Sequence, residues 1–180
     1  MKSPMRLVRD KKGSTAVEFA LVLPAFLTLM FSIFEVGWFY FVNSQVDAAT
    51  LRAARFIRTG QAQQMQFDRD EFFNAVCPSL QIFGNCSERM TVEVETFANF
   101  AELAADASTP VCRDDLPQFV DAIPYQPGID NDIVRLRICL IYKTINPALG
   151  INVSDSSSGS RRLYGTHLFR NEPYSRSNGN

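Results

Sequence analysis

The sequence predicts an α+β protein in which a long N-terminal helix, transmembrane in its first half, packs on a small disulfide-bonded domain with an antiparallel sheet. Three observations predict this class. An apolar run of membrane length follows a short basic segment, later segments alternate apolar and polar residues as half-buried strands do, and all four cysteines lie beyond residue 76. Membrane anchor and soluble domain are therefore expected to share one continuous helix.

Length and charge restrict the possible functions. A chain of 180 residues accommodates about one globular domain plus an appendage. The net charge of −1 hides an asymmetry, because residues 1–12 carry five Lys or Arg and one Asp while the rest is slightly acidic. No extended basic patch with interleaved aromatic residues follows this segment, so a nucleic-acid-binding protein is excluded.

The apolar run Phe19–Val42 contains a single charge, Glu35, near its far end. At about 1.5 Å per residue it covers a bilayer core of about 30 Å, and Pro24 is expected to kink or locally unwind it. The basic segment predicts a cytoplasmic N-terminus and a C-terminal domain on the far side of the membrane. A removable secretory signal is the alternative, although its apolar core would be shorter and Val46 and Ala48 offer only a weak cleavage site.

The helical pattern continues past the apolar run. Apolar residues at positions 42, 46, 49, 53 and 56 recur at spacings of four, three, four and three, and Gly60 is a natural C-terminal cap. We therefore expect one helix of about 45 residues from Ser14, about 65–70 Å long. The predicted divisions are a leader peptide (1–13), a transmembrane helix (14–42), a continuation of that helix outside the membrane (43–60) and an α+β domain (61–180).

Shorter elements are predicted within the α+β domain. Asp68 and Glu71 have the spacing of a capping box that opens a short helix ending at Cys77. Alternation predicts strands over residues 90–97, 133–144 and 163–169, with a helical turn over 100–105 and a proline-rich connection up to residue 131.

Charges on the outward side of the first two strands match in spacing. Glu93 and Glu95 lie on one strand, and Arg135 and Arg137 lie on the other. If the strands are antiparallel neighbours, these side chains form cross-strand pairs worth some tenths of a kcal/mol each.

The four cysteines are expected to form two structural disulfides. Cys77 and Cys86 flank a short segment that suits a local bridge, and Cys112 and Cys139 could then join the proline-rich connection to the central strand. Three connectivities are possible, and the sequence does not choose among them. No CxxC spacing occurs and His167 is the single histidine, so we expect no metal, no cofactor and no enzymatic activity.

The start of the apolar run carries a carboxylate that needs a chemical explanation. Cleavage after Gly13 would leave a new amino group on Ser14, and Glu18 lies one helical turn further on, about 6 Å along the axis. Pairing of this carboxylate with an amino group of a neighbouring subunit would set the register of two helices. Alternatively, the helix is a fixed signal-anchor whose Glu18 snorkels to the cytoplasmic headgroups. Glu35, about 25 Å further along the helix, is expected to be solvated at the outer interface or paired along the helix.

Residues 12–24 (KGSTAVEFALVLP) resemble the N-terminal signature of TadE/TadF-like pseudopilins of the tight-adherence (Tad, or Flp) pilus system. The resemblance is carried by residues 12–56 and implies a pilin-like fold. It also implies that a prepilin peptidase removes the leader after Gly13, with Ser14, Glu18 and Phe19 belonging to the processing motif.

The same resemblance implies a location and a set of partners. The chain would lie in the bacterial inner membrane with its domain in the periplasm, as a minor pseudopilin that primes or supports pilus assembly. Its partners would be other pseudopilins and pilins, the inner-membrane assembly platform and the lipid bilayer. Two alternatives are an uncleaved bitopic protein whose periplasmic domain binds a ligand or partner, and a secreted enzyme for which we find no catalytic residues.

Overall fold

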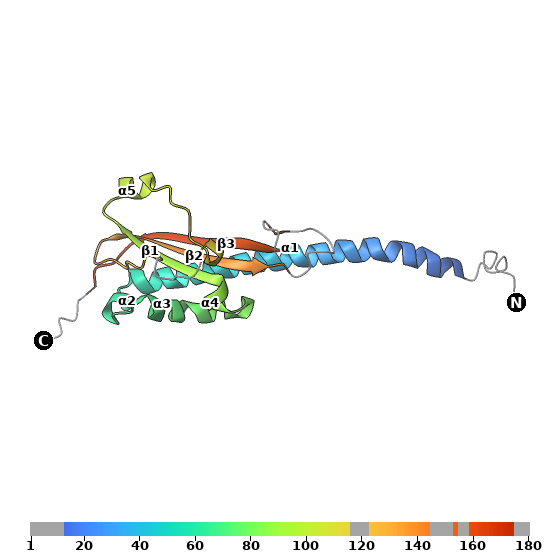
Figure 1. The fold of residues 1–180 in the computed structure, drawn as a ribbon, viewed down its shortest axis with the longest axis horizontal. Coiled ribbons are helices and arrows are strands. Elements are labelled where there is room, and N and C mark those ends of the chain that lie inside the picture. The colour runs from blue at the N-terminus through green and yellow to red at the C-terminus, as the bar shows by residue number, and fades with distance from the viewer. Residues whose placement is uncertain (1–12, 116–122, 145–152, 155–158, 175–180) are drawn as a thin grey trace.

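One helix, α1 (Ser14–Arg58, 45 residues), dominates the computed structural model and projects far beyond the sheet-containing domain (Figure 1). The structure describes residues 13–115, 123–144, 153–154 and 159–174. Residues 1–12 of the expected leader and residues 116–122 of the proline-rich connection lie outside the described residues. The predicted length and start of the helix are confirmed.

The course of α1 follows the sequence pattern with two corrections. The helix continues as an α-helix through Pro24, so the expected local unwinding is wrong. This part curves only gently (Figure 1), as long helices commonly do, and Thr28 Oγ1 donates to the carbonyl oxygen of Pro24 at 2.8 Å. At the other end Ile57, rather than Phe56, is fully buried because the last step of the apolar stripe is four residues long. Gly60 then adopts a left-handed conformation (φ 75°), as expected for a residue that follows a helix.

The sheet has three antiparallel strands in the order β1-β2-β3. They are β1 (Met90–Phe97), β2 (Ile133–Lys143) and β3 (Ser160–Arg170). The first two match the prediction to within one residue, whereas β3 starts three residues earlier than predicted. The C-terminal half of α1 packs on one face of the sheet and contributes core residues, among them Val42, Val46, Ala49, Ala53 and Ile57.

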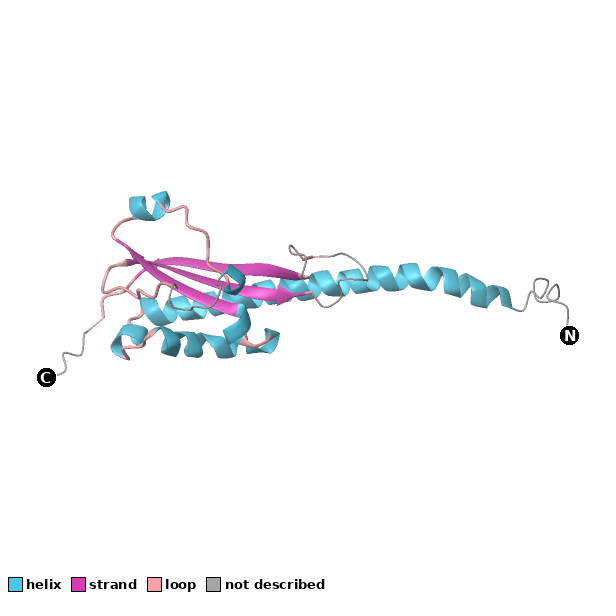
Figure 2. Cartoon of the chain, viewed as in Figure 1, coloured by secondary structure: helices cyan, strands magenta, loops and turns pink. Residues whose placement is uncertain are grey.

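Short helices complete the domain. They are α2 (Gln61–Gln64), α3 (Arg69–Val76), α4 (Cys86–Arg89) and α5 (Phe100–Ala105). Asp68 and Glu71 form both hydrogen bonds of the predicted capping box at the start of α3. The helices α2, α3 and α4 lie along the C-terminal half of α1, and α5 projects from the other side of the sheet (Figure 2).

Two disulfides crosslink segments of the domain. Cys77 bonds Cys86 with a Cα–Cα distance of 5.9 Å, and Cys112 bonds Cys139 with a Cα–Cα distance of 5.5 Å. Of the three possible connectivities, the structure therefore has the local bridge plus the bridge from the connection to β2. The fold class predicted from sequence is confirmed.

Candidate functional site

The first described residue, Gly13, directly precedes α1. Its backbone angles (φ −100°, ψ 0°) are accessible to any residue, and a Cβ added there would meet nothing within 4 Å. The fold itself therefore gives no reason for a glycine at this position. A requirement for glycine here would have to come from a molecule that acts on the chain.

Glu18 lies one turn into the same helix, at the distance that the sequence predicts. Ser14 Oγ donates a hydrogen bond to Glu18 Oε1 at 3.1 Å, and both residues are exposed. Phe19, the aromatic residue that follows, is 63% exposed. The residues of the expected processing motif thus lie on an accessible helical surface, with the Ser14 hydroxyl in contact with the Glu18 carboxylate.

The first part of α1 is not packed against the domain, since none of residues 14–31 is buried. By length and composition α1 could cross a membrane, and none of its most apolar window is buried. Its large apolar side chains are exposed, including Val17, Leu21, Val22, Phe26, Leu29 and Phe34. Such a surface needs a lipid or protein environment, because exposure of this much contiguous apolar area to water is unfavourable.

Glu35 corrects an expectation from the sequence. It is only 3% exposed rather than solvated, and it accepts a hydrogen bond of 3.0 Å from Tyr142 Oη near the end of β2. Burial, and then this hydrogen bond to Glu35, raise the pKa of Tyr142. The sheet therefore contacts α1 closer to the N-terminus than the helical periodicity indicated. The only signal for this contact in the sequence was Tyr142, whose phenol lies on the inner face of the predicted strand.

Aromatic contacts strengthen the same junction between α1 and the sheet. The ring of Phe39 lies 6.0 Å from that of Tyr142, and the Arg161 guanidinium of β3 lies 4.9 Å from the Phe39 ring centroid. The membrane-length part of the helix is thereby joined to the sheet by specific side-chain contacts as well as by the continuous backbone.

On the opposite face of the sheet, the cross-strand charge pairs expected from the sequence are formed. Glu93 is paired with Arg137, and Glu95 with Arg135. Arg137 Nε lies 3.0 Å from Glu93 Oε2, an ion pair without the angle of a good hydrogen bond, and Arg137 Nη2 donates to Glu95 Oε2 at 3.1 Å.

This charged face is covered, which the sequence did not predict. Residues 106–113, named here the strap, cross over it: Arg137 Nη1 donates to the Ser108 carbonyl at 2.8 Å, and Asp106 forms an ion pair with Arg135. The disulfide Cys112–Cys139 closes the strap onto β2. Glu93, Arg135 and Arg137 are consequently only 2–6% exposed.

The strap changes the titration of the carboxylates that it touches. Burial raises the pKa of Glu93, despite the opposing charge of Arg137. Hydrogen bonds from the backbone and hydroxyl of Ser108, and then from Arg135, lower the pKa of Asp106 to about 2. The cluster is therefore an interlocked structural network, and its members bond one another rather than a ligand.

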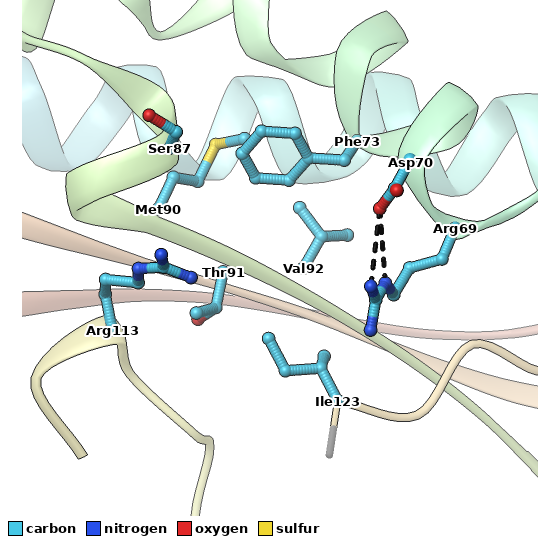
Figure 3. A pocket seen from close by; sticks show the side chains of 9 residues that line it. All are labelled: Arg69, Asp70, Phe73, Ser87, Met90, Thr91, Val92, Arg113 and Ile123. Atoms are coloured by element: carbon cyan, nitrogen blue, oxygen red, sulfur yellow. Dashed lines mark hydrogen bonds and ion pairs between the residues drawn. The ribbon is translucent and has the colours of Figure 1, made fainter. Parts of the chain in front are cut away.

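A small, mainly apolar pocket lies between α3, α4 and β1 (Figure 3). Met90, Val92, Phe73 and Ile123 line it, and Arg113 and the Arg69–Asp70 ion pair lie at its sides. Its volume of about 180 Å³ is below the range of typical small-molecule sites. The two hydroxyls that line it donate elsewhere, Ser87 to Asn85 and Thr91 to the Val111 carbonyl, rather than to the lining carboxylate of Asp70.

The remaining candidates for chemistry are the single histidine and clusters of metal-binding side chains. His167 is half-buried on β3 with its ring 6.2 Å from that of Phe169. Across the part of the chain that the structure describes, no cluster of three or more His, Cys, Asp or Glu residues could hold a metal ion.

An exposed membrane-length helix that continues as the core helix of a disulfide-bonded α+β domain defines a pilin-like protein. Residues 13–55 match the family model of TadE-like proteins. The resemblance noted in the sequence is thereby confirmed over this segment, which contains Gly13, Glu18 and most of α1. Comparisons with curated proteins and with solved structures gave no significant match.

Proposed function

We propose that this protein is a minor pseudopilin that prepilin peptidase processes after Gly13 and that primes or supports assembly of a Tad-type pilus. The TadE-like segment indicates a pseudopilin associated with such pili. The observation that carries the finer proposal is the accessible motif at the start of α1, where a glycine that the fold does not need precedes an exposed Ser14–Glu18 pair.

Processing would create a positively charged partner for Glu18. After cleavage the α-ammonium group of Ser14 would lie one turn from this carboxylate, on the same helix or on a neighbour. A charge pair of this kind is favoured in lipid, because an isolated carboxylate there costs a few kcal/mol. Glu18 and the new amino group would thus guide contacts with other pilins and with the membrane assembly platform.

Topology supports the same function. The proposed divisions are a leader (1–13), a membrane span (14–42), its continuation (43–60) and a periplasmic domain (61–180). The one membrane-length helix in the described part of the chain and the basic leader favour a single pass with a cytoplasmic N-terminus in the bacterial inner membrane. Two disulfides fit an oxidising compartment such as the periplasm.

The mature N-terminus tests the processing step. Intact mass and terminal sequencing of the chain, with and without a co-expressed prepilin peptidase, should give a start at Ser14 only when the peptidase is present. Gly13→Val should block cleavage without unfolding the domain. Gly37→Val is the matched control, because an added Cβ at that glycine also meets nothing within 4 Å. A leader retained in every condition would favour the uncleaved bitopic protein instead.

Glu18 tests the assembly step. Glu18→Ala should leave the domain folded, because Glu18 is exposed and its one hydrogen bond is to Ser14 within the same turn. Pilus number, counted by electron microscopy, should fall strongly while thermal unfolding of the domain stays unchanged. Normal piliation by this variant would show that the carboxylate has no role in assembly.

A further inference from the structure

From residue 40 onward, the exposed side of α1 carries a regular stripe of side chains. Its positions recur at spacings of four, three, four, four and three, the spacing of one helix face. We name it the outer stripe; its members are Tyr40, Ser44, Asp47, Leu51, Arg55 and Arg58. All are exposed except Arg58, which is half-buried, and Leu51 leaves 55% of its surface in solvent.

Two opposite charges on the outer stripe have no partner within the described part of the chain. Asp47 and Arg55 form no side-chain hydrogen bond or ion pair there, whereas Arg58 pairs with Glu172 at 3.2 Å. Asp47 and Arg55 are eight residues apart, or about 12 Å along the axis, which is too far for them to pair within one helix.

An open groove adjoins the C-terminal half of the outer stripe, from Leu51 to Arg58. It lies between the last turns of α1 and the chain from β3 onward, and Leu51, Arg55, Arg58 and His167 are among the residues that line it. Arg52 and Glu172 also line the groove. Because Glu172 already pairs with Arg58, the cations that a carboxylate approaching along the stripe would meet are Arg52 and Arg55. Ser44, beside Asp47, and Ala48 are small enough to allow a second helix to come close.

We propose that the outer stripe is an interface between two copies of this chain, whose parallel α1 helices are displaced by about eight residues, or about 12 Å. In this register Asp47 of one copy meets Arg55 of the next, and the exposed Leu51 side chain of each copy lies one helical turn from this contact, on opposite sides of it. At equal depth, Asp47 would face Asp47 and Arg55 would face Arg55, which is unfavourable. The charge pattern therefore favours copies that step along the helix axis, and the inference rests on the proposed role in pilus assembly.

Crosslinking between two differently tagged full-length copies tests the displacement. Ser44→Cys in one copy and Leu51→Cys in the other lie at nearly the same height in the displaced register. A short bifunctional maleimide added to piliated cells should join this pair more efficiently than it joins Ser44→Cys to itself or Leu51→Cys to itself. Predominant same-position crosslinks would overturn the displaced register.

Charge exchange tests the named contact in the same cells. Asp47→Arg or Arg55→Asp alone should lower the 44–51 crosslink yield by about two- to fivefold. The double variant Asp47→Arg/Arg55→Asp should restore it, because the pair is reversed rather than removed. No crosslink between copies, in cells where the chain is processed at Gly13 and pili form, would overturn the second copy as partner. Failure of the unmodified chain to be processed would overturn the proposed function instead.

Discussion

At the scale of single residues, Arg137 is the centre of the charged cluster under the strap. Its guanidinium contacts Glu93, Glu95 and the carbonyl of Ser108, and it is only 4% exposed. A buried pair of this kind contributes little net stability, because the cost of removing both charges from water offsets their attraction. Removal of one partner is different, since it leaves the other charge buried and uncompensated.

Arg137→Met should therefore lower the free energy of unfolding by about 3–5 kcal/mol. The double variant Glu93→Leu/Arg137→Met should recover most of this loss, because no charge of that pair is then left buried. Denaturant unfolding of the full chain in detergent micelles measures both. Arg162→Met is the matched control: its ion pair with Asp114 is 35–41% exposed, so a loss below about 1 kcal/mol is expected. Equal losses for both arginines would contradict this account.

Asp106 makes stability depend on pH in the acid range. Its pKa in the folded protein is about 2, below the ordinary value of 3.8, so its ionised form is stabilised by folding. That contribution is fully present above about pH 4 and is lost as the pH falls from there to about 2. Asp106→Asn should be less stable at neutral pH and should lose less further stability across this window. Midpoints of thermal unfolding at a series of pH values test this, and parallel curves for both proteins would contradict it.

At the scale of elements, α1 and β3 lie in close contact at Gly165. A Cβ at this position would lie 2.0 Å from Thr50 Oγ1, 3.0 Å from Thr50 Cβ and 3.2 Å from the Val46 carbonyl oxygen. Gly165→Ala should thus push the helix off the strand and destabilise the domain by about 1–3 kcal/mol. Adding Thr50→Ala should restore only part of the loss, because the contacts to Cβ and to the backbone remain.

Thermal unfolding of these variants, followed by circular dichroism, provides the measurement. Gly37→Ala is the control, since α1 leaves open space at that glycine. A Gly165→Ala protein as stable as the Gly37→Ala protein would show that helix and strand are not in close contact there.

Local patterns explain which elements could be predicted from the sequence. The apolar spacing of α1, the Asp68–Glu71 box and the alternation in β1 and β2 are each specified within a few residues, and all three are confirmed. Cross-strand pairing of two Glu with two Arg also followed from matched charges on two strands, and the structure places Glu93 opposite Arg137. The sequence could not show which surfaces of these elements are covered by other parts of the chain.

Two covered surfaces illustrate this limit. The charged face of the sheet has the alternation of a solvated face, but a strap with no regular secondary pattern folds over it. Glu35 has the position of an interfacial carboxylate, yet Tyr142, distant in sequence, buries it. In both cases the deciding contact is long-range and polar, and neither kind of contact leaves a periodic signal in the chain.

At the scale of the whole molecule, one helix serves two environments, and the boundary between them is sharp. None of residues 14–31 is buried, whereas Ser32, Glu35, Val42 and Val46 are. The domain therefore uses α1 as a core element from about residue 32 onward, and the preceding part is free to contact lipid or other helices. Assembly contacts and domain stability should be separable by truncation.

A chain that begins at Phe31 should fold and unfold cooperatively, because it keeps the Glu35–Tyr142 hydrogen bond and the apolar residues of α1 that pack on the sheet. A chain that begins at Thr50 should fail to fold, since it lacks Val42 and Val46, both 0% exposed and each worth about 1.5–3 kcal/mol of burial. Near-UV circular dichroism and the sharpness of urea unfolding distinguish the two. Equal stability of both chains would mean that the sheet needs no support from residues 31–49 of α1, and that Thr50–Arg58 with the rest of the domain is sufficient.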